Sequence, residues 1–108
     1  MVEAATSGLK VFHSLWGFRG TCDAAIAQAK ARGFDGLEAN LRHSSIAALE
    51  PTQLISSLRN SQLELVVEVI TGGDYVPDLS ASPEQHLAEL SEQLARAEHL
   101  QPERITLI

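Results

Sequence analysis

The sequence predicts an α/β domain built on a parallel β-sheet. Four short segments rich in Val, Ile, Leu and Phe alternate with three segments in which apolar residues recur at helical spacing, giving the order βαβαβαβ. No two neighbouring strands are joined by a tight hairpin, and strands separated by single helices favour parallel pairing with right-handed crossovers. The chain of 108 residues is 44% hydrophobic, which suits one modest core, and no linker divides it.

The first strand and first helix are predicted between residues 9 and 33. Leu9–Leu15 is an apolar segment, and the loop WGFRG follows it. Thr21 is the expected N-cap of the helix, with Asp23 in the first turn, where the helix dipole favours an acid. Gly33 is the expected stop. The predicted buried face of this helix consists of Cys22, Ala25, Ile26 and Ala29.

The second strand, second helix and third strand follow. Phe34–Asn40 alternates, so that Leu37 and Ala39 point to one side while Glu38 and Asn40 point to the other. Pro51 is expected at the start of the second helix, a position that proline favours. Leu63–Ile70 is a β-branched run that Glu68 interrupts. The predicted buried stripe of the second helix consists of Leu54, Ile55 and Leu58.

The third helix and a fourth strand complete the pattern. Ser82 is the predicted N-cap, followed by Pro83 at the first helical position and Gln85 to complete a capping box. Pro102 is expected to end the helix, and Arg104–Ile108 to form the fourth strand. The predicted apolar face of the helix consists of Leu87, Leu90, Leu94 and Ala97.

Charge and composition exclude several classes of function. Acidic residues outnumber basic ones by 14 to 8, a net charge of −6, which disfavours nucleic acids and anionic membranes as partners. The single cysteine, Cys22, excludes an internal disulfide and a cysteine-rich zinc site, and we expect it to fill the core. The amino terminus lacks the features of a signal peptide, and no apolar run reaches the length of a membrane span. We therefore expect a cytoplasmic protein.

Glu38 and Glu68 are the sharpest functional candidates. In parallel α/β folds ligands bind beyond the carboxyl ends of the strands, and both glutamates lie near such ends on consecutive strands. A carboxylate in a buried strand costs several kcal/mol unless it is paired, hydrogen-bonded or protonated. The two side chains could line one ligand cavity. Alternatively, each could have a structural partner such as Arg42, Arg104 or a backbone amide.

Other polar and aromatic side chains fall near the same predicted edge. His13 could face a pocket mouth or lie hydrogen-bonded in the core, and Trp16 could stack on a ligand or cap the barrel mouth. The full set of predicted substrate-binding residues is His13, Trp16, Glu38, Asn40, Glu68, Asp74 and Tyr75.

No sequence motif indicates a bound metal or nucleotide. The chain contains no HxxxH, HExxH or CxxC, so we expect no self-contained transition-metal site. Gly17 and Gly20 form a GxxG, which is neither a dinucleotide-binding GxGxxG nor a phosphate loop with its lysine. His43 lies in a predicted loop, whereas His86 and His99, on the third helix, are spaced too far apart for a metal pair and are expected to be exposed.

Three segments together resemble the xylose isomerase-like TIM barrels: SLWGFRGTCDAAIAQAKARGFDGLEAN, LELVVEVITGGDYVPD and SPEQHLAELSEQLARAEHLQPERITLI. The stretch GFDGLEAN is similar to the second-strand signature of that group. The resemblance begins at Lys10 and covers the first half of the family's barrel. It implies that residues 1–108 form a single partial domain, with the first four strands and three helices of a (β/α)₈ barrel. A flavodoxin-like open sheet is the alternative fold.

The resemblance also implies a function. The superfamily includes sugar-phosphate isomerases and epimerases, hydroxypyruvate isomerase and repair enzymes of the endonuclease IV type. It implies that this chain is the amino-terminal fragment of a metal-dependent sugar or sugar-phosphate isomerase or epimerase. The intact enzyme would act on a small sugar-like substrate with Mn, Mg, Co or Zn. The family's metal ligands and proton-transferring glutamates lie largely on later strands, so we expect this chain to bind no metal and to be inactive alone.

Two alternatives accompany that interpretation. The first is a non-catalytic half-barrel that acts by assembling with another chain. The second is a repair-enzyme fragment, although that branch places a metal-binding histidine after the third strand, where this chain has VITGGDY. In a half-barrel the open sheet edges would favour association, and so would an apolar patch exposed on the uncovered inward face. We expect a homodimer or a complex with a missing carboxyl-terminal half.

Overall fold

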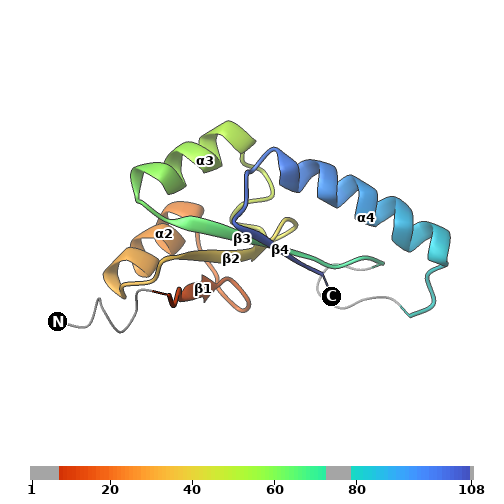
Figure 1. Ribbon diagram of the computed structural model, residues 1–108, viewed down its shortest axis with the longest axis horizontal. Coiled ribbons are helices and arrows are strands. Elements are labelled where there is room, and N and C mark those ends of the chain that lie inside the picture. Colours follow the sequence, from red (N-terminus) through yellow and green to blue (C-terminus); the bar gives the residue numbers. More distant parts are fainter. Residues whose placement is uncertain (1–7, 73–78, 108) are drawn as a thin grey trace.

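The computed structural model describes residues 8–72 and 79–107 and confirms the α/β class (Figure 1). The first three strands are shorter than predicted, and the first is reduced from seven residues to three, with Leu9 and Val11 exposed before it. The elements are β1 (Phe12–Ser14), α2 (Cys22–Ala31), β2 (Gly36–Asn40), α3 (Pro51–Asn60), β3 (Glu64–Val69), α4 (Pro83–Glu98) and β4 (Arg104–Leu107).

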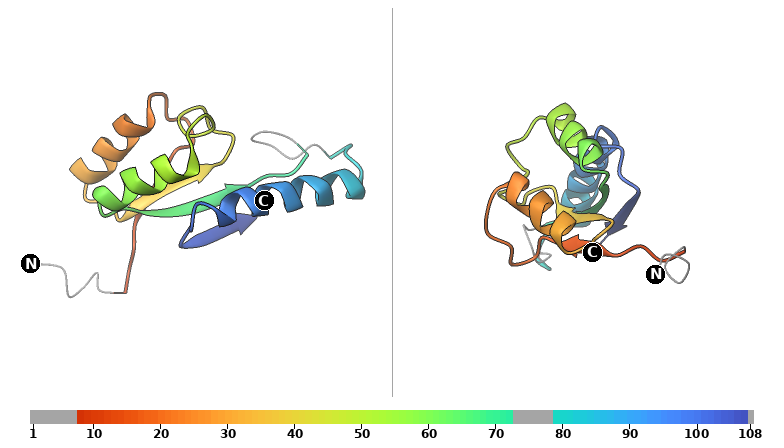
Figure 2. Two further views of the ribbon diagram at one scale, coloured as in Figure 1. Left: turned by 90° about the horizontal axis from the view of Figure 1, so that it is seen from above. Right: turned by 90° about the vertical axis from the view of Figure 1, so that its left-hand side faces the viewer.

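The four strands form one parallel sheet in the sequential order β1-β2-β3-β4. All three helices lie on the same side of this sheet (Figures 1 and 2). A flavodoxin-like sheet instead reverses the direction in which strands are added and carries helices on both faces. The flavodoxin-like alternative is therefore wrong, and what the structure establishes is a sequential four-stranded βαβαβαβ layer.

The two faces of the sheet differ in chemistry. The face under the helices supplies the core through Leu37, Leu65, Val67 and Val69, which pack with buried residues of α2 and α3. The opposite face, which we call the helix-free face, is mostly polar, so the expectation that it exposes an apolar patch is wrong. The helix-free face consists of Phe12, Ser14, Gly36, Glu38, Asn40, Glu64, Val66, Glu68, Arg104 and Thr106.

Local signals in the sequence placed the helix starts correctly. The Thr21 hydroxyl accepts a hydrogen bond from the Ala24 N–H at 3.1 Å, and the Ser82 hydroxyl accepts one from the Gln85 N–H at 3.1 Å. Pro51 begins α3 as predicted. The predicted faces of α2 and α3 are buried except for Ile55, which is half-buried.

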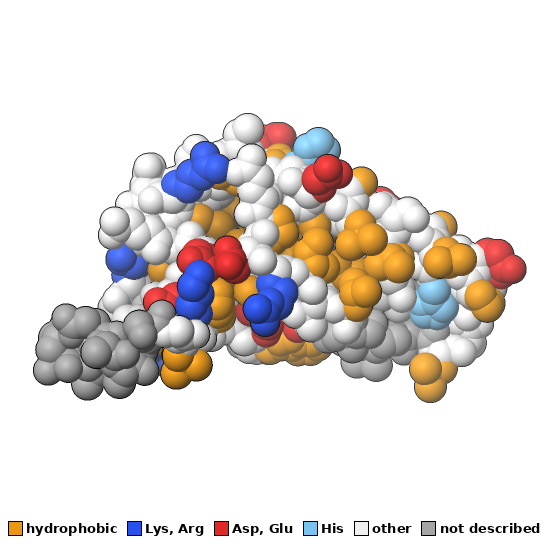
Figure 3. Space-filling view, viewed as in Figure 1, with side chains coloured by type: hydrophobic (Ala, Val, Ile, Leu, Met, Phe, Trp, Pro, Cys, Tyr) orange, Lys and Arg blue, Asp and Glu red, His pale blue; other side chains and the backbone are white. Residues whose placement is uncertain are grey.

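The predicted apolar face of α4 is wrong at Leu87 and Leu94, which are 63% and 38% exposed. The buried residues of α4 are Ala97, as predicted, and Gln93, which was not predicted. Gln93 is held inward because its side-chain N–H donates to the Ile70 carbonyl at 2.7 Å, which offsets part of the cost of burying an amide. Because α4 buries Gln93 in this way, hydrophobic side chains remain exposed along the helix, as Figure 3 shows.

Cys22 lies at the start of α2 and is buried, as predicted for a core residue. Burial and, secondarily, the negative charge of Asp23 raise the pKa of its thiol, so the thiol stays neutral near pH 7. Among the helices of the described ranges, none has both the length and the apolar composition needed to cross a membrane.

Candidate functional site

The centre of the candidate site is a hydrogen bond between Trp16 and Glu68. Glu68 lies near the carboxyl end of β3 and is only 5% exposed. Its Oε2 accepts the indole Nε1–H of Trp16 at 2.9 Å, whereas its Oε1 is buried without a hydrogen-bond partner among the described residues. Neither Arg42 nor Arg104, the structural partners considered above, pairs with it in the described part of the chain. A buried carboxylate oxygen without a donor is rare and marks a place where a ligand or water can donate.

Glu38 and Asn40 share the helix-free face with Glu68. Asn40 is opposite Glu68 in the sheet register, and Glu68 is opposite Thr106, so these three residues form one row. Glu38 lies two residues before Asn40 on β2, which places it diagonal to Glu68, and it is half-buried. The Asn40 Oδ1 accepts the Arg42 N–H at 2.8 Å, which fixes its amide at the end of the strand. The structure thus brings Trp16, Glu38, Asn40 and Glu68 together.

On the amino-terminal side of this row, the helix-free face contains a hollow of about 550 Å³. Arg104 reaches it from β4 and has no ion pair with a described residue, whereas Lys10 is 2.8 Å from Glu64 and 3.6 Å from Glu103. Arg104 was not predicted to bind a ligand, although the alternation in RITLI separates Arg104 and Thr106 from the apolar positions. The lining residues are Gly8, Lys10, Phe12, Glu38, Val66, Glu103, Arg104 and Thr106.

His13 lies on the other face of the sheet. Its ring stacks on Phe34 with centroids 5.5 Å apart and meets Phe18 edge-on at 5.9 Å, on the side that α2 covers. Its Nε2 is buried without a partner among the described residues. His13 therefore does not face the same side as Glu38 and Glu68. It lies on the core side of the sheet.

His43 is a buried residue at the site that sequence reasoning treated only as a loop position. It is 5% exposed and, with Leu15, Trp16, Glu38 and Asn40, lines a cavity of about 10 Å³. The Ser45 N–H donates to its Nδ1 at 3.1 Å, so Nε2 carries the hydrogen and donates to the Phe18 carbonyl at 3.2 Å. The spacing of His43 and Ser45, two residues apart, permits such a local turn, but nothing in the sequence showed that it would pack below Trp16.

The end of β3 is attached to α4 by polar contacts. The Glu89 carboxylate pairs with Arg42 at 3.0 Å and accepts the Gly72 N–H at 3.1 Å. The Thr71 hydroxyl and the His86 Nδ1 are 2.8 Å apart, so His86 is not the fully exposed residue expected. The remaining predicted candidates, Asp74 and Tyr75, lie outside the described residues.

The Glu89 contacts predict an acid-dependent loss of stability. Hydrogen bonding to Arg42, then to Gly72, lowers the pKa of Glu89 below its ordinary value. A carboxyl whose folded pKa is depressed stabilises the fold above its unfolded pKa, and this stabilisation is lost as the pH falls through the folded value. The melting temperature should therefore fall less between about pH 6 and pH 3 in Glu89→Gln than in the wild-type chain.

The matched control is Glu92→Gln, an exposed position on the same helix. Because Arg42 and Glu89 are partly exposed, the effect should be small, and thermal unfolding across that pH range measures it. Identical pH profiles for wild type and Glu89→Gln would contradict the assignment.

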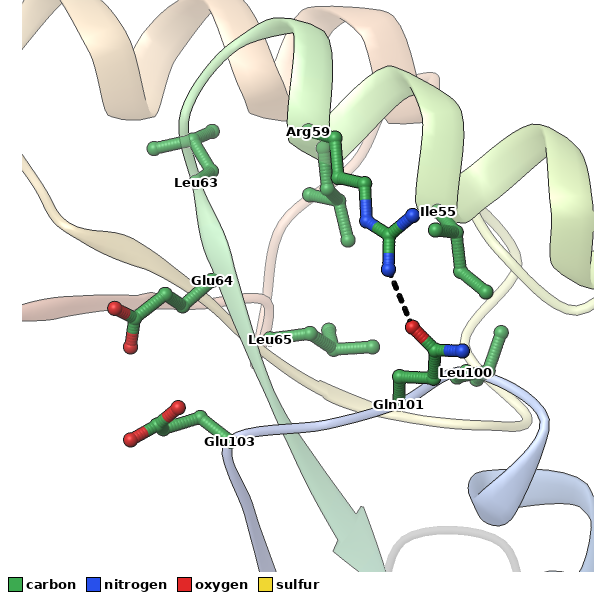
Figure 4. A pocket seen from close by; sticks show the side chains of 9 residues that line it. Ile55, Arg59, Leu63, Glu64, Leu65, Leu100, Gln101 and Glu103 are labelled. Carbon is green, nitrogen blue, oxygen red and sulfur yellow. Dashed lines mark hydrogen bonds between the residues drawn. The ribbon is translucent and has the colours of Figure 1, made fainter.

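A second cavity lies at the amino ends of β3 and β4, far along the strands from Glu68. It measures about 150 Å³, and Figure 4 shows Arg59 reaching across it to a hydrogen bond with the Gln101 side chain. None of the predicted substrate-binding residues lines it. Its lining residues are Ile55, Leu58, Arg59, Leu63, Glu64, Leu65, Leu100, Gln101 and Glu103.

Within residues 8–72 and 79–107, no three His, Cys, Asp or Glu side chains gather closely enough to hold a metal ion. Glu38 and Glu68 are two carboxylates without a third ligand of this kind among the residues that the structure describes. No protein-family model, curated protein or solved structure matches the chain. The likeness to xylose isomerase-like barrels therefore rests on the residues of the chain itself.

Proposed function

We propose that this chain forms the first half of a xylose isomerase-like (β/α)₈ barrel and supplies part of the substrate site of a sugar isomerase or epimerase. The sequential strand order and the helices on one face support the proposal. A full barrel continues the same order around a closed sheet, with its helices outside and its ligand site at the carboxyl ends of the strands. The helix-free face would then be the barrel interior.

One observation carries the functional part: one oxygen of the Glu68 carboxylate accepts a hydrogen bond from Trp16, and the other is buried without a hydrogen-bond partner among the described residues. Sugar hydroxyls are donors that suit an unpaired carboxylate oxygen. Trp16, 49% exposed, offers an aromatic surface beside it for the apolar C–H groups of a sugar ring. Glu38 and Asn40 add polar groups along the same end of the sheet.

The metal implied by the resemblance does not fit the described residues of this chain. Two carboxylates on neighbouring strands, Glu38 and Glu68, leave the ligand set incomplete. We therefore assign this chain substrate binding, with proton transfer and any Mn, Mg, Co or Zn held by residues beyond those described. The isolated chain is expected to show no turnover of aldoses or ketoses, with or without added metal.

A non-catalytic half-barrel that assembles with another chain is the second candidate. It is favoured by the exposed apolar side chains of α4 and β4, among them Leu87, Leu94 and Leu107. Such a scaffold would need partner contacts but no ligand at Glu68. Binding measurements at that residue therefore separate the two candidates.

Glu68→Gln is expected to weaken sugar binding roughly tenfold, about 1.4 kcal/mol, with little loss of stability. The amide can still accept the Trp16 N–H but has lost the charge that strengthens hydrogen bonds from sugar hydroxyls. Trp16 is the only tryptophan of the chain, so its fluorescence reports directly on this site. Titration with a panel of aldoses and ketoses measures the affinity, and thermal unfolding measures the stability.

Glu64→Gln is the matched control, since Glu64 lies on the same strand and face but pairs with Lys10. It should leave the affinity unchanged. A chain whose Trp16 fluorescence responds to no sugar, or a Glu68→Gln variant that loses stability while binding normally, would refute the proposed function.

A further inference from the structure

We propose that Arg104 binds the anionic end of the ligand whose hydroxyl groups bind at Glu38 and Glu68. The ligand would then be a polyol with a terminal carboxylate or phosphate, not a neutral sugar. This inference rests on the proposed function, because it uses the same face of the sheet, and it adds the charge and orientation of the ligand.

The register places Arg104 and Glu38 in one row of the helix-free face. Arg104 is opposite Val66 on β3, and Val66 is opposite Glu38 on β2. All three line the hollow of about 550 Å³. Two strand spacings separate the backbones of Arg104 and Glu38, roughly 9.6 Å, with an apolar side chain between them. The two opposite charges share the hollow, and no ion pair joins them in the described structure.

The charges around the hollow leave Arg104 available. Lys10, the other cation of the lining, is already paired with Glu64 and lies near Glu103. Arg104 has no such partner among the described residues, and its guanidinium stays charged at any physiological pH. Five N–H donors in a planar fork match a carboxylate or phosphate better than they match neutral hydroxyls.

The same charges would orient the ligand. Glu38 and Glu68 repel an anion and accept hydrogen bonds from hydroxyls, whereas Arg104 attracts the anion at the β4 side of the hollow. Thr106, two residues after Arg104 and opposite Glu68, lies between these two regions and can bond to either part. A ligand charged at one end and hydroxylated at the other therefore satisfies both sides, and a neutral sugar leaves Arg104 unpaired.

The test compares glucose, glucose 6-phosphate and glucuronate, which share a carbon skeleton and differ at the sixth carbon. Trp16 fluorescence of the 108-residue chain measures each affinity at one fixed salt concentration. The wild-type chain should bind at least one of the two anions tenfold or more tightly than glucose, and the tighter of the two identifies phosphate or carboxylate as the group recognised.

Arg104→Gln should abolish that preference, and Arg104→Lys should retain only part of it. Arg59→Gln is the control, because Arg59 belongs to α3, lines the separate cavity of about 150 Å³ and is not among the residues that line the hollow (Figure 4). If Arg104→Gln keeps the preference, or if glucose binds as tightly as the anions, the inference fails and the proposed function stands. If none of the three compounds nor the wider sugar panel alters the fluorescence, both fail.

Discussion

At micromolar concentration the 108-residue chain is expected to sediment as a dimer or larger assembly, not as an 11.7 kDa monomer. In the described structure β1 and β4 are the outer strands of the sheet, and each has one side without a neighbouring strand. Such edges present unpaired N–H and C=O groups that template association. Leu107, on the edge strand β4, is 58% exposed, and Leu87 and Leu94 of α4 are exposed as well.

The geometry favours a particular pairing. A twofold axis parallel to the barrel axis would set β4 of one copy beside β1 of the other, in parallel, and would repeat this at the second junction. Eight strands in that order can close into a barrel. Because the helix-free face is polar, the apolar contribution to association must come from the edges and from α4, not from the inward side chains.

Replacing both Leu87 and Leu94 by Glu is expected to shift the chain toward the monomer. Sedimentation velocity over a range of concentrations is the measurement. Leu79→Glu serves as the control, because Leu79 is already 95% exposed and precedes α4 in the chain. A wild-type chain that behaves as one well-folded 11.7 kDa species, with a melting temperature independent of concentration, would exclude the expectation.

Gly36→Ala is expected to cost about 3 kcal/mol or more of unfolding free energy, at or above the upper end of typical overpacking effects. Gly36 opens β2 and is opposite both Phe12 on β1 and Glu64 on β3. A methyl group there would meet the Glu64 carbonyl oxygen well inside contact distance, and would be 2.7 Å from the Phe12 ring. The carbonyl belongs to β3, an inner strand of the sheet, so it cannot move without breaking strand pairing.

Chemical denaturation measures this loss as a lower midpoint. Gly8→Ala is the control, because a methyl group at Gly8 meets no atom within 4 Å and should change the midpoint little. Equal midpoints for the two variants would show that β2 and β3 can separate enough to accept a side chain. Since domains of this size are stable by only about 5–15 kcal/mol, the expected loss is a large fraction of the total.

The alternation of strands and helices and the helix starts were predictable because their causes lie within a few consecutive residues. Thr21 and Ser82 cap the helices that follow them, and the spacing of Ala25 and Ala29 defines a buried stripe whatever packs on it. The shared face of Glu38 and Asn40 follows from the two-residue period of a strand. These signals needed no knowledge of distant parts of the chain.

The site was predictable only in part. Glu68 was expected to face a cavity, but its bond to Trp16, 52 residues away, arises from the packing of the β1–α2 loop over the end of β3. His13 is on a strand of three residues, too short for the two-residue period to predict its face, and it lies half-buried on the core side against Phe18 and Phe34. Arg104 and His43 became candidates only once register and loop packing placed them.

What the sequence by itself determined is therefore the order of the elements, their caps and the polar side of β2, because each depends on neighbouring residues. The tertiary structure alone decided which face of α4 is buried. Hydrophobic spacing favoured Leu87 and Leu94 for the core, yet Gln93 is buried, since its amide satisfies the Ile70 carbonyl at the end of β3. Which face of a helix is buried depends partly on the backbone groups beneath it that need hydrogen-bond partners. Here such a group comes from the end of β3, which is distant in the sequence.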